Sequence, residues 1–194
     1  MKTIVLASNN KHKIKEFKDI LKDYKILSLN DIGYTDEIEE NGTTFEENSL
    51  IKAKTIHNYL KKDHPDYLVI ADDSGLCVDS LNGEPGVYSA RYAGEHGNNE
   101  ANRAKLQKEL IGKNREANFN CTIVVYYPNE TYKVFHGKTY GTITEEERGK
   151  TDFGYDCIFL SKDLNKTFGE ATEEEKNKVS HRGRAIEAML KELS

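Results

Sequence analysis

Adjacent carboxylates in the middle of this 194-residue chain have the chemistry of a divalent-cation site. Asp72 and Asp73 directly follow the apolar run 67–71, and Glu39 and Glu40 lie in an acidic loop upstream. Neighbouring carboxylates repel each other, and Mg²⁺ relieves that repulsion by binding one or two of them together with water and phosphate oxygens. An aspartate before Ser-Gly is also a good turn former, so a simple turn is the alternative interpretation.

A second polar run is expected where the first strand meets the first helix. The free N–H groups and positive end of a helix N-terminus suit phosphate, and a lysine one turn into the helix adds positive charge. The alternative is a plain asparagine N-cap beside a solvated lysine. The run is not a glycine-rich phosphate loop, which excludes the mechanism that depends on one. Its residues are Ser8, Asn9, Asn10, Lys11, His12 and Lys13.

Asn48 and Lys52 are spaced i, i+4 on a predicted helix, outside its apolar stripe. Such a pair is suited to a phosphate site, although an ordinary solvated helix face has the same pattern. The helix itself is predicted from Thr44 and Glu47, which form a capping-box pattern.

The C-terminal third carries residues that are able to hold a nucleobase. An aromatic ring stacks on the face of a base, and arginine or histidine donates hydrogen bonds to a base carbonyl. The alternatives are an aromatic core turn and a Ser180 N-cap followed by an exposed first helical turn. The candidates are Phe153, Gly154, Tyr155, Asp156, Lys176, His181 and Arg182.

Hydrophobic periodicity predicts the elements that position these residues. Strands are expected at 3–7, 67–71, 118–127, 132–137 and 157–160, and helices near 10–21, 44–62, 98–111 and 181–193. Early β-α-β alternation followed by a hairpin indicates an α/β fold with a mixed sheet.

Length and composition limit the class of protein further. A chain of 194 residues suits a single domain, 1–194. The net charge of −5 argues against binding a nucleic-acid polymer. No apolar run has the length of a membrane span or a signal peptide, and the three cysteines lack metal-binding spacing. A cytoplasmic protein with reduced thiols is therefore expected.

Six motifs together resemble the inosine triphosphate pyrophosphatase family, along the whole chain. Besides the runs already named, the resemblance includes Ser74 with the residues around it, and the segment 85–92. The family's first motif usually reads Thr-Gly-Asn, whereas Ser8-Asn9-Asn10 stands here. Because asparagine tolerates left-handed backbone, we expect function to be retained. The motif segments are 8–13, 42–48 with 52–53, 71–76, 85–92, 153–156 and 180–183.

The resemblance implies an elongated α/β fold whose central mixed sheet, flanked by helices, separates two lobes with the active site in the cleft. It implies a Mg²⁺-dependent homodimer, with one or more ions per subunit, that hydrolyses ITP, dITP and XTP to the monophosphate and pyrophosphate. Asp73 resembles the catalytic proton acceptor and metal ligand, Glu40 a further ligand, and Ser74 a substrate contact. Asp72 is a third candidate ligand, and which of the two aspartates is the base stays open.

Two other functions fit parts of the pattern. A related pyrophosphatase acting on modified pyrimidine or methylated nucleotides is disfavoured by the 153–156 and 181–182 motifs. A non-catalytic nucleotide sensor is disfavoured because a binding protein has little reason to cluster Glu40, Asp72 and Asp73.

Overall fold

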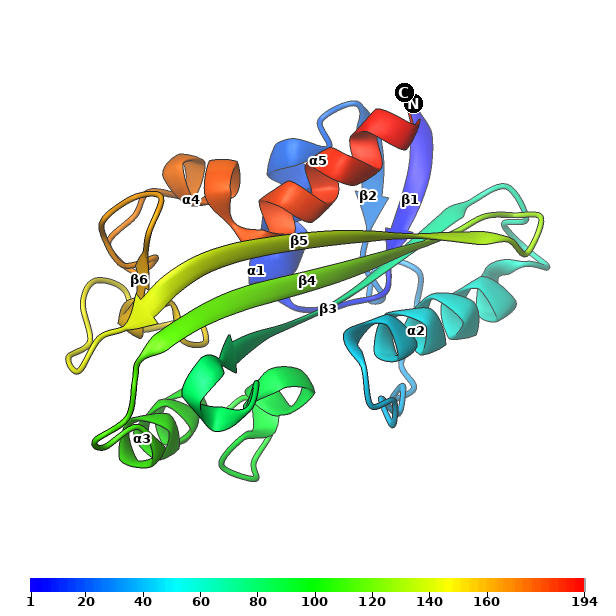
Figure 1. Ribbon diagram of the computed structural model, residues 1–194. Coiled ribbons are helices and arrows are strands. Elements are labelled where there is room, and N and C mark those ends of the chain that lie inside the picture. Colours follow the sequence, from blue (N-terminus) through cyan, green and yellow to red (C-terminus); the bar gives the residue numbers. More distant parts are fainter. Residues whose placement is uncertain (194) are drawn as a thin grey trace. The chain divides into compact units, whose positions relative to one another are not determined.

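The computed structural model describes residues 1–193, which form a six-stranded mixed sheet flanked by helices (Figure 1). The strand order is β2-β1-β3-β4-β5-β6. Strand β1 pairs in parallel with β2 and β3, whereas β5 and β6 are antiparallel. The α/β class with a mixed sheet, predicted from the sequence, is confirmed. The strands are β1 (Lys2–Leu6), β2 (Tyr24–Leu27), β3 (Leu68–Val78), β4 (Glu116–Tyr126), β5 (Tyr132–Ile143) and β6 (Phe159–Ser161).

Residues 1–193 also form five α-helices and three short 3₁₀ helices, and the last two α-helices follow the last strand. None of the helices in this range is both long enough and apolar enough to cross a membrane. The α-helices are α1 (Lys11–Ile20), α2 (Phe45–Leu60), α3 (Asn99–Glu109), α4 (Glu173–Val179) and α5 (His181–Leu193). The 3₁₀ helices are η1 (Asp79–Leu81), η2 (Gly86–Arg91) and η3 (Asp156–Ile158).

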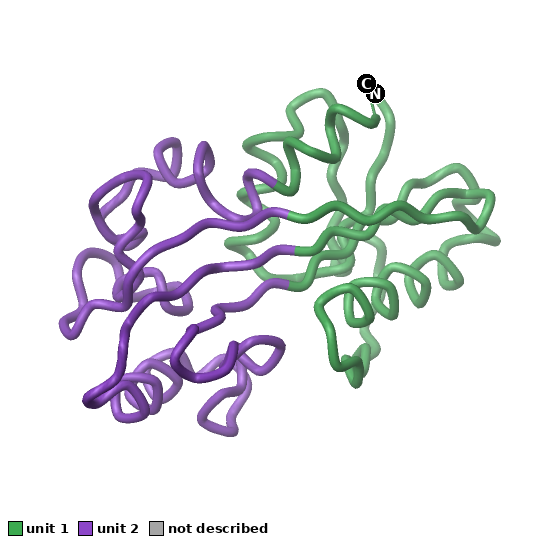
Figure 2. Tube along the Cα trace, viewed as in Figure 1, with its two compact units in different colours: residues 1–73, 122–136, 185–194 green, residues 74–121, 137–184 purple. Residues whose placement is uncertain are grey.

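The chain forms two compact units, coloured separately in Figure 2. Unit 1 contains residues 1–73, 122–136 and 185–194, and unit 2 contains 74–121 and 137–184. The boundary cuts β3 between Asp73 and Ser74. The candidate residues therefore fall into two groups, one in each unit.

The core of unit 1 packs one face of the strands against α2. Side chains alternate between the two faces of a strand, so every second residue of β1, β3 and β4 points to the same helix. The other face is also apolar and lies on the side of α1 and α5 (Figure 1). The residues that pack with Ala53, Ile56 and Leu60 of α2 include Val5, Val69, Ala71, Val124 and Tyr126.

The core of unit 2 is built around aromatic side chains. Phe119 of β4 lies against both Phe159 and Phe168, with ring centroids 4.4 and 6.0 Å apart. Leu106 of α3 and Leu76 of β3 belong to the same buried cluster. Tyr155, Cys157 and Ile158 belong to this cluster, which therefore anchors the segment 153–158.

Several elements differ from the prediction. Strand β2 was missed, and β5 continues to Ile143 rather than ending at 137. The strand predicted at 67–71 continues to Val78, so the aspartates lie within β3 rather than after it. The pairing of β3 with β1 ends at Ile70, and Asp72 and Asp73 lie beyond that point. Strand β3 continues there because β4 still lies beside it. The strand predicted at 157–160 is η3 followed by β6. Helix α4 was missed, although Thr172 and Glu175 at its start form a complete capping box.

The capping box of α4 gives a pH-dependent prediction. Glu175 accepts hydrogen bonds from Lys166 Nζ at 2.9 Å and from the Thr172 backbone N–H at 3.1 Å, and these lower its pKa from 4.5 to about 2. A depressed carboxyl pKa stabilises the fold above the ordinary value, and the stabilisation is lost as the pH falls toward the folded value. We expect Glu175→Gln to lower the urea midpoint of unfolding at neutral pH. The midpoints of the variant and the parent protein should converge as the pH falls from 4.5 to about 2. Glu174→Gln, which removes an exposed i, i+4 partner of Lys178, is the control and should change little.

Candidate active site

The polar run after β1 caps helix α1. The Asn10 side chain accepts hydrogen bonds from the backbone N–H groups of His12 and Lys13 at 3.0 and 3.2 Å, and Ser8 Oγ accepts from Asn10 N–H at 3.0 Å. The asparagine N-cap suggested by the sequence is thus present. The side chains of Lys11 and His12 are exposed, while Lys13 is half-buried.

Asn9 does not have the left-handed backbone that its replacement of a glycine suggested, since its φ is not among the positive values in the chain. Its side-chain oxygen instead accepts a hydrogen bond from Asn30 N–H at 2.8 Å. The substitution therefore ties the loop to the segment after β2 and requires no strained conformation.

Asn10 offers a prediction that separates capping from phosphate binding. Asn10→Ala removes the cap and should lower the free energy of unfolding by about 1 kcal/mol. Asn10→Asp retains a good cap but places a negative charge at the helix N-terminus, so stability should persist while the affinity for inorganic pyrophosphate, used as a probe anion, weakens. Urea melts and the dissociation constants of pyrophosphate for both variants test this. Unchanged pyrophosphate affinity in Asn10→Asp would show that anions bind elsewhere.

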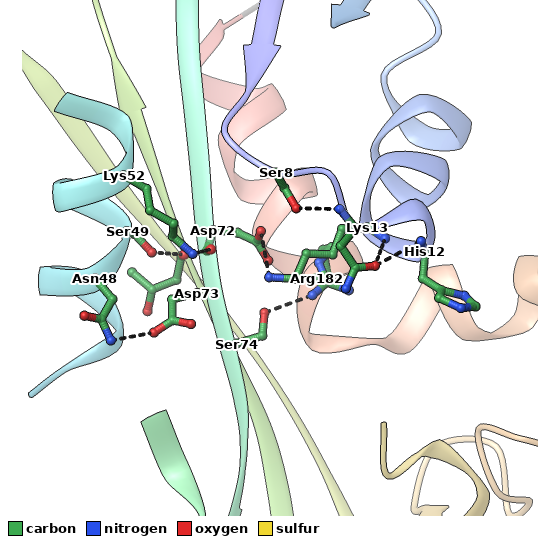
Figure 3. Close-up of polar contacts among 12 residues, drawn as sticks. Ser8, His12, Lys13, Asn48, Ser49, Lys52, Asp72, Asp73, Ser74 and Arg182 are labelled. Atoms are coloured by element: carbon green, nitrogen blue, oxygen red, sulfur yellow. Dashed lines mark hydrogen bonds and ion pairs between the residues drawn. The ribbon is translucent and has the colours of Figure 1, made fainter. Parts of the chain in front are cut away.

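Unit 1 brings lysines and carboxylates together at β3, as Figure 3 shows. Lys52 Nζ lies 2.8 Å from Glu40 Oε1 and donates to the Asp72 carbonyl oxygen at 2.6 Å. Lys13 Nζ lies 3.3 Å from Asp72 Oδ1, whose side chain is nearly inaccessible. Helix α1, the acidic loop, α2 and β3 thus each contribute a charged side chain to one cluster, which we call the acid–lysine cluster (Lys13, Glu40, Lys52, Asp72 and Asp73).

Asn48 fixes the orientation of Asp73. Its Nδ2 donates to Asp73 Oδ2 at 3.1 Å, and its Oδ1 accepts from Gly42 N–H at 2.8 Å. Since a backbone N–H only donates, the amide oxygen must face Gly42 and the amide nitrogen must face the carboxylate. A Cβ on Gly42 would lie 2.6 Å from Asn48 Oδ1, so glycine permits this close approach. The prediction that Asn48 and Lys52 share a face is correct, and both are buried rather than solvated.

Burial and charge oppose each other in the cluster. Burial raises the pKa of the Asp73 carboxyl, and the charges of Lys52 and Lys13 offset this only in part. Burial alone lowers the pKa of Lys52, but Asp73, Glu40 and Asp72 together outweigh it and raise the pKa above its ordinary value. Lys52 is therefore a buried ammonium group held by carboxylates.

The donor set fits a hard divalent cation. Carboxylate oxygens are the ligands Mg²⁺ prefers, and Lys13 and Lys52 already bring positive charge to them. Over residues 1–193, no group of three His, Cys, Asp or Glu side chains is placed to hold a metal by itself.

Unit 2 gathers the predicted base-binding residues. Lys176 Nζ of α4 contacts Asp156 Oδ2 at 2.7 Å, and both side chains are buried. The same ammonium lies 4.7 Å from the centroid of the Phe153 ring, at cation–π distance. Lys176, Asp156 and Phe153 thus form one group that presents an aromatic ring and two charged groups.

The start of α5 is also buried in unit 2. Ser180 is the predicted N-cap, since its Oγ accepts from Gly183 N–H at 2.9 Å. Arg182 Nη2 donates to Ser74 Oγ at 3.0 Å (Figure 3), and His181 stacks on Phe119 at 4.7 Å. The exposed first turn considered in the sequence analysis is therefore wrong for both residues.

Sequence reasoning missed two contacts to the segment 153–156. Arg103 of α3 donates from Nη1 to the Gly154 carbonyl oxygen at 2.8 Å, and Tyr155 Oη donates to the Ser89 carbonyl oxygen at 2.7 Å. Burial raises the pKa of Tyr155, which keeps this hydroxyl protonated as a donor. Arg103 was not singled out because it lies in a helix rich in charged residues, and only its position near the apolar Leu106 indicated burial.

Comparisons with known proteins identify the family of this chain. The family model described as Ham1 family matches residues 4–192. A Clostridium perfringens protein named dITP/XTP pyrophosphatase is 53% identical, covering 100% of this chain and 98% of its own length. A Bacillus subtilis protein of the same name is 48% identical with the same coverage. The solved structure of the Staphylococcus aureus Ham1 protein has a TM-score of 0.86 and 43% identity, covering 99% of this chain and 98% of that one.

The fold and the relatives define an α/β enzyme of the nucleoside-triphosphate pyrophosphatase class, which confirms the enzyme class predicted from the sequence. The chain belongs to the Ham1 family.

Proposed function

We propose that the protein hydrolyses the non-standard purine nucleoside triphosphates ITP, dITP and XTP to the nucleoside monophosphate and pyrophosphate. Water adds across the α–β phosphoanhydride bond, so one substrate and one water give two products. The observation that carries this proposal is the acid–lysine cluster at β3, where two lysines able to bind phosphate lie against carboxylates. The names of the relatives support the substrate class.

The triphosphate is bound by the positive groups of unit 1. The N-terminus of α1, Lys13 and Lys52 attract phosphate oxygens and stabilise the leaving pyrophosphate. In the absence of substrate the two lysines neutralise Asp72 and Glu40. When the phosphates bind, we expect each ammonium group to exchange its carboxylate partner for a phosphate oxygen.

Asp73 orients and deprotonates the attacking water. Its carboxylate is held by Asn48 through one oxygen, Oδ2, which fixes the direction of the group. Burial favours the protonated form of Asp73, which makes the carboxylate a stronger base than an exposed aspartate. Asp72, whose Oδ1 faces Lys13, is the second candidate for the same role.

Glu40, Asp72 and Asp73 are the residues that would hold Mg²⁺. A bound Mg²⁺ supplies neutralisation of the charge that develops on the phosphates. The oxygen chemistry of these side chains and their attraction for the two lysine cations support this assignment.

The base is recognised by unit 2. Phe153 stacks on the purine ring, while Lys176, His181 and Arg182 supply donors for the 6-oxo group of hypoxanthine or xanthine. Ser74, Gly154, Tyr155 and Asp156 complete the contacts. Adenine presents an amino donor at this position and would leave a buried donor unpaired, and a mismatch of this kind can cost on the order of 10⁴-fold in kcat/KM.

We propose further that the protein acts as a cytoplasmic homodimer with one or more Mg²⁺ per subunit. In that setting it removes non-standard nucleotides before polymerases incorporate them into DNA or RNA.

A substrate panel tests the proposed function. Purified protein with Mg²⁺ is assayed on ITP, XTP, GTP and ATP, and ³¹P NMR identifies the products. We expect ITP and XTP to be preferred, with monophosphate and pyrophosphate formed in equal amounts. Preference for GTP or ATP would contradict the specificity, and release of orthophosphate would contradict the bond assignment.

A further inference from the structure

We propose that Arg103 is a positioning residue for substrate recognition, which holds the segment 153–156 in the conformation that grips the base. The inference rests on the proposed function, because it assigns a role to a side chain that supports the base-binding segment. Arg103 lies on α3, far in sequence from that segment, and belongs to unit 2 together with it.

The first observation is the geometry of the guanidinium group. Arg103 Nε donates to Glu147 Oε1 at 2.8 Å, while Nη1 donates to the Gly154 carbonyl oxygen at 2.8 Å. Arg103 is only 5% exposed. A planar guanidinium group that bonds two partners fixes their relative direction, which a flexible point charge such as lysine does not. Arg103 therefore ties the Gly154 peptide to the loop after β5.

The second observation is the backbone at Gly154. Its φ is +53°, in the left-handed region, yet a Cβ built there meets no atom within 4 Å. Glycine is therefore required for the conformation of the backbone and not for space. Because this conformation directs the Gly154 carbonyl toward α3, the donor supplied by Arg103 helps to hold the turn.

The third observation is the arrangement of the neighbouring contacts. Tyr155 is held through Ser89 and Asp156 through Lys176. Gly154 lies between these anchors and Phe153, so its peptide sets the direction in which the chain presents the Phe153 ring. Loss of the Arg103 bond should let this peptide rotate while both anchors remain.

The charge pair itself does not explain why Arg103 is buried. The Glu147 side chain is 44% exposed, and ion pairs with solvated partners contribute little to stability. The hydrogen bond to the Gly154 carbonyl oxygen is the contact that connects Arg103 to the base-binding segment 153–156. We therefore expect a change in base recognition rather than in the chemistry at β3.

The experiment compares Arg103→Met with Arg115→Met in the full-length protein. Arg115 is a matched control, because it is a half-buried arginine of unit 2 that donates to the Ile143 and Thr144 carbonyl oxygens. Neither of these partners belongs to the segment 153–156. Inhibition constants are measured for IMP, which carries the base, and for pyrophosphate, which does not, together with KM and kcat for ITP.

Arg103→Met should raise the inhibition constant of IMP and the KM of ITP at least about tenfold, since small displacements of a positioning group have large effects. The inhibition constant of pyrophosphate and kcat should stay within about twofold, and Arg103→Lys should recover part of the IMP affinity because it restores one donor. Arg115→Met should leave all four constants unchanged.

Unaltered IMP inhibition in Arg103→Met would overturn the proposal, and so would an equal weakening of IMP and pyrophosphate, which indicates general disruption. A purely structural role would lower apparent kcat through loss of folded protein and leave KM unchanged, which also contradicts it. Failure of the proposed function is distinguishable, because the parent protein would then neither hydrolyse ITP nor bind IMP.

Discussion

Asp73→Asn should reduce kcat for ITP hydrolysis by on the order of 10²–10⁴-fold, the contribution typical of a positioned general base. Asparagine has nearly the same shape and can still accept the hydrogen bond from Asn48, so the local structure should persist. It cannot take a proton from water, and it removes one negative charge from the acid–lysine cluster. Steady-state kinetics measure kcat, and equilibrium binding of a non-hydrolysable ITP analogue measures affinity.

The binding measurement distinguishes catalysis from folding. Affinity for the analogue without a divalent ion should change little, because Lys13 and Lys52 remain. Asp79→Asn, at the exposed residue that follows β3, is the matched control and should retain full turnover. If Asp73→Asn turns over ITP at nearly the rate of the parent protein, Asp73 is not the base, and Asp72 is then the remaining candidate.

Lys52→Met should give the largest loss of stability among these variants. Lys52 is buried between Glu40 and Asp72, and Asp73 contributes to its raised pKa. Breaking a buried ion pair by removing one partner costs about 3–5 kcal/mol, because the remaining charges are left uncompensated. Urea denaturation in the presence of a chelator measures this loss.

Mg²⁺ should restore part of the lost stability. A cation that binds the folded state stabilises it, and the uncompensated carboxylates of the variant should bind Mg²⁺ more tightly than those of the parent protein. The shift in melting temperature on adding Mg²⁺ is therefore expected to be larger in Lys52→Met. Lys61→Met, at a half-exposed lysine that follows the same helix, should show neither effect. Equal shifts in all three proteins would place the metal away from the cluster.

Much of the site could be predicted because its residues lie in regular elements with readable signals. The i, i+4 spacing of Asn48 and Lys52 placed both on one helix face, and the capping residues Thr44 and Asn10 fixed where α2 and α1 begin. Parallel pairing of β1 with β3 then brings the loop after β1 near Asp72. Local periodicity and capping were sufficient for these residues.

Other features depend on contacts that periodicity does not encode. The polar Asp72-Asp73 pair looked like the end of a strand, yet β3 continues through it because its neighbour β4 provides pairing along a greater length than β1. The role of Arg103 depends on Gly154, 51 residues away, and in its polar helix the nearby Leu106 is a weak local sign of burial. Helix α4 was detectable from Thr172 and Glu175, but its seven residues are too few for an apolar stripe.

Binding of Mn²⁺ in place of Mg²⁺, followed by electron paramagnetic resonance with a non-hydrolysable ITP analogue, tests the central claim most directly. If Asp73 and its neighbours hold the cation that accompanies the triphosphate, Mn²⁺ binds the parent protein and its affinity falls at least about tenfold in Asp73→Asn, because a charged ligand is lost. Equal Mn²⁺ affinity in the two proteins would contradict the account.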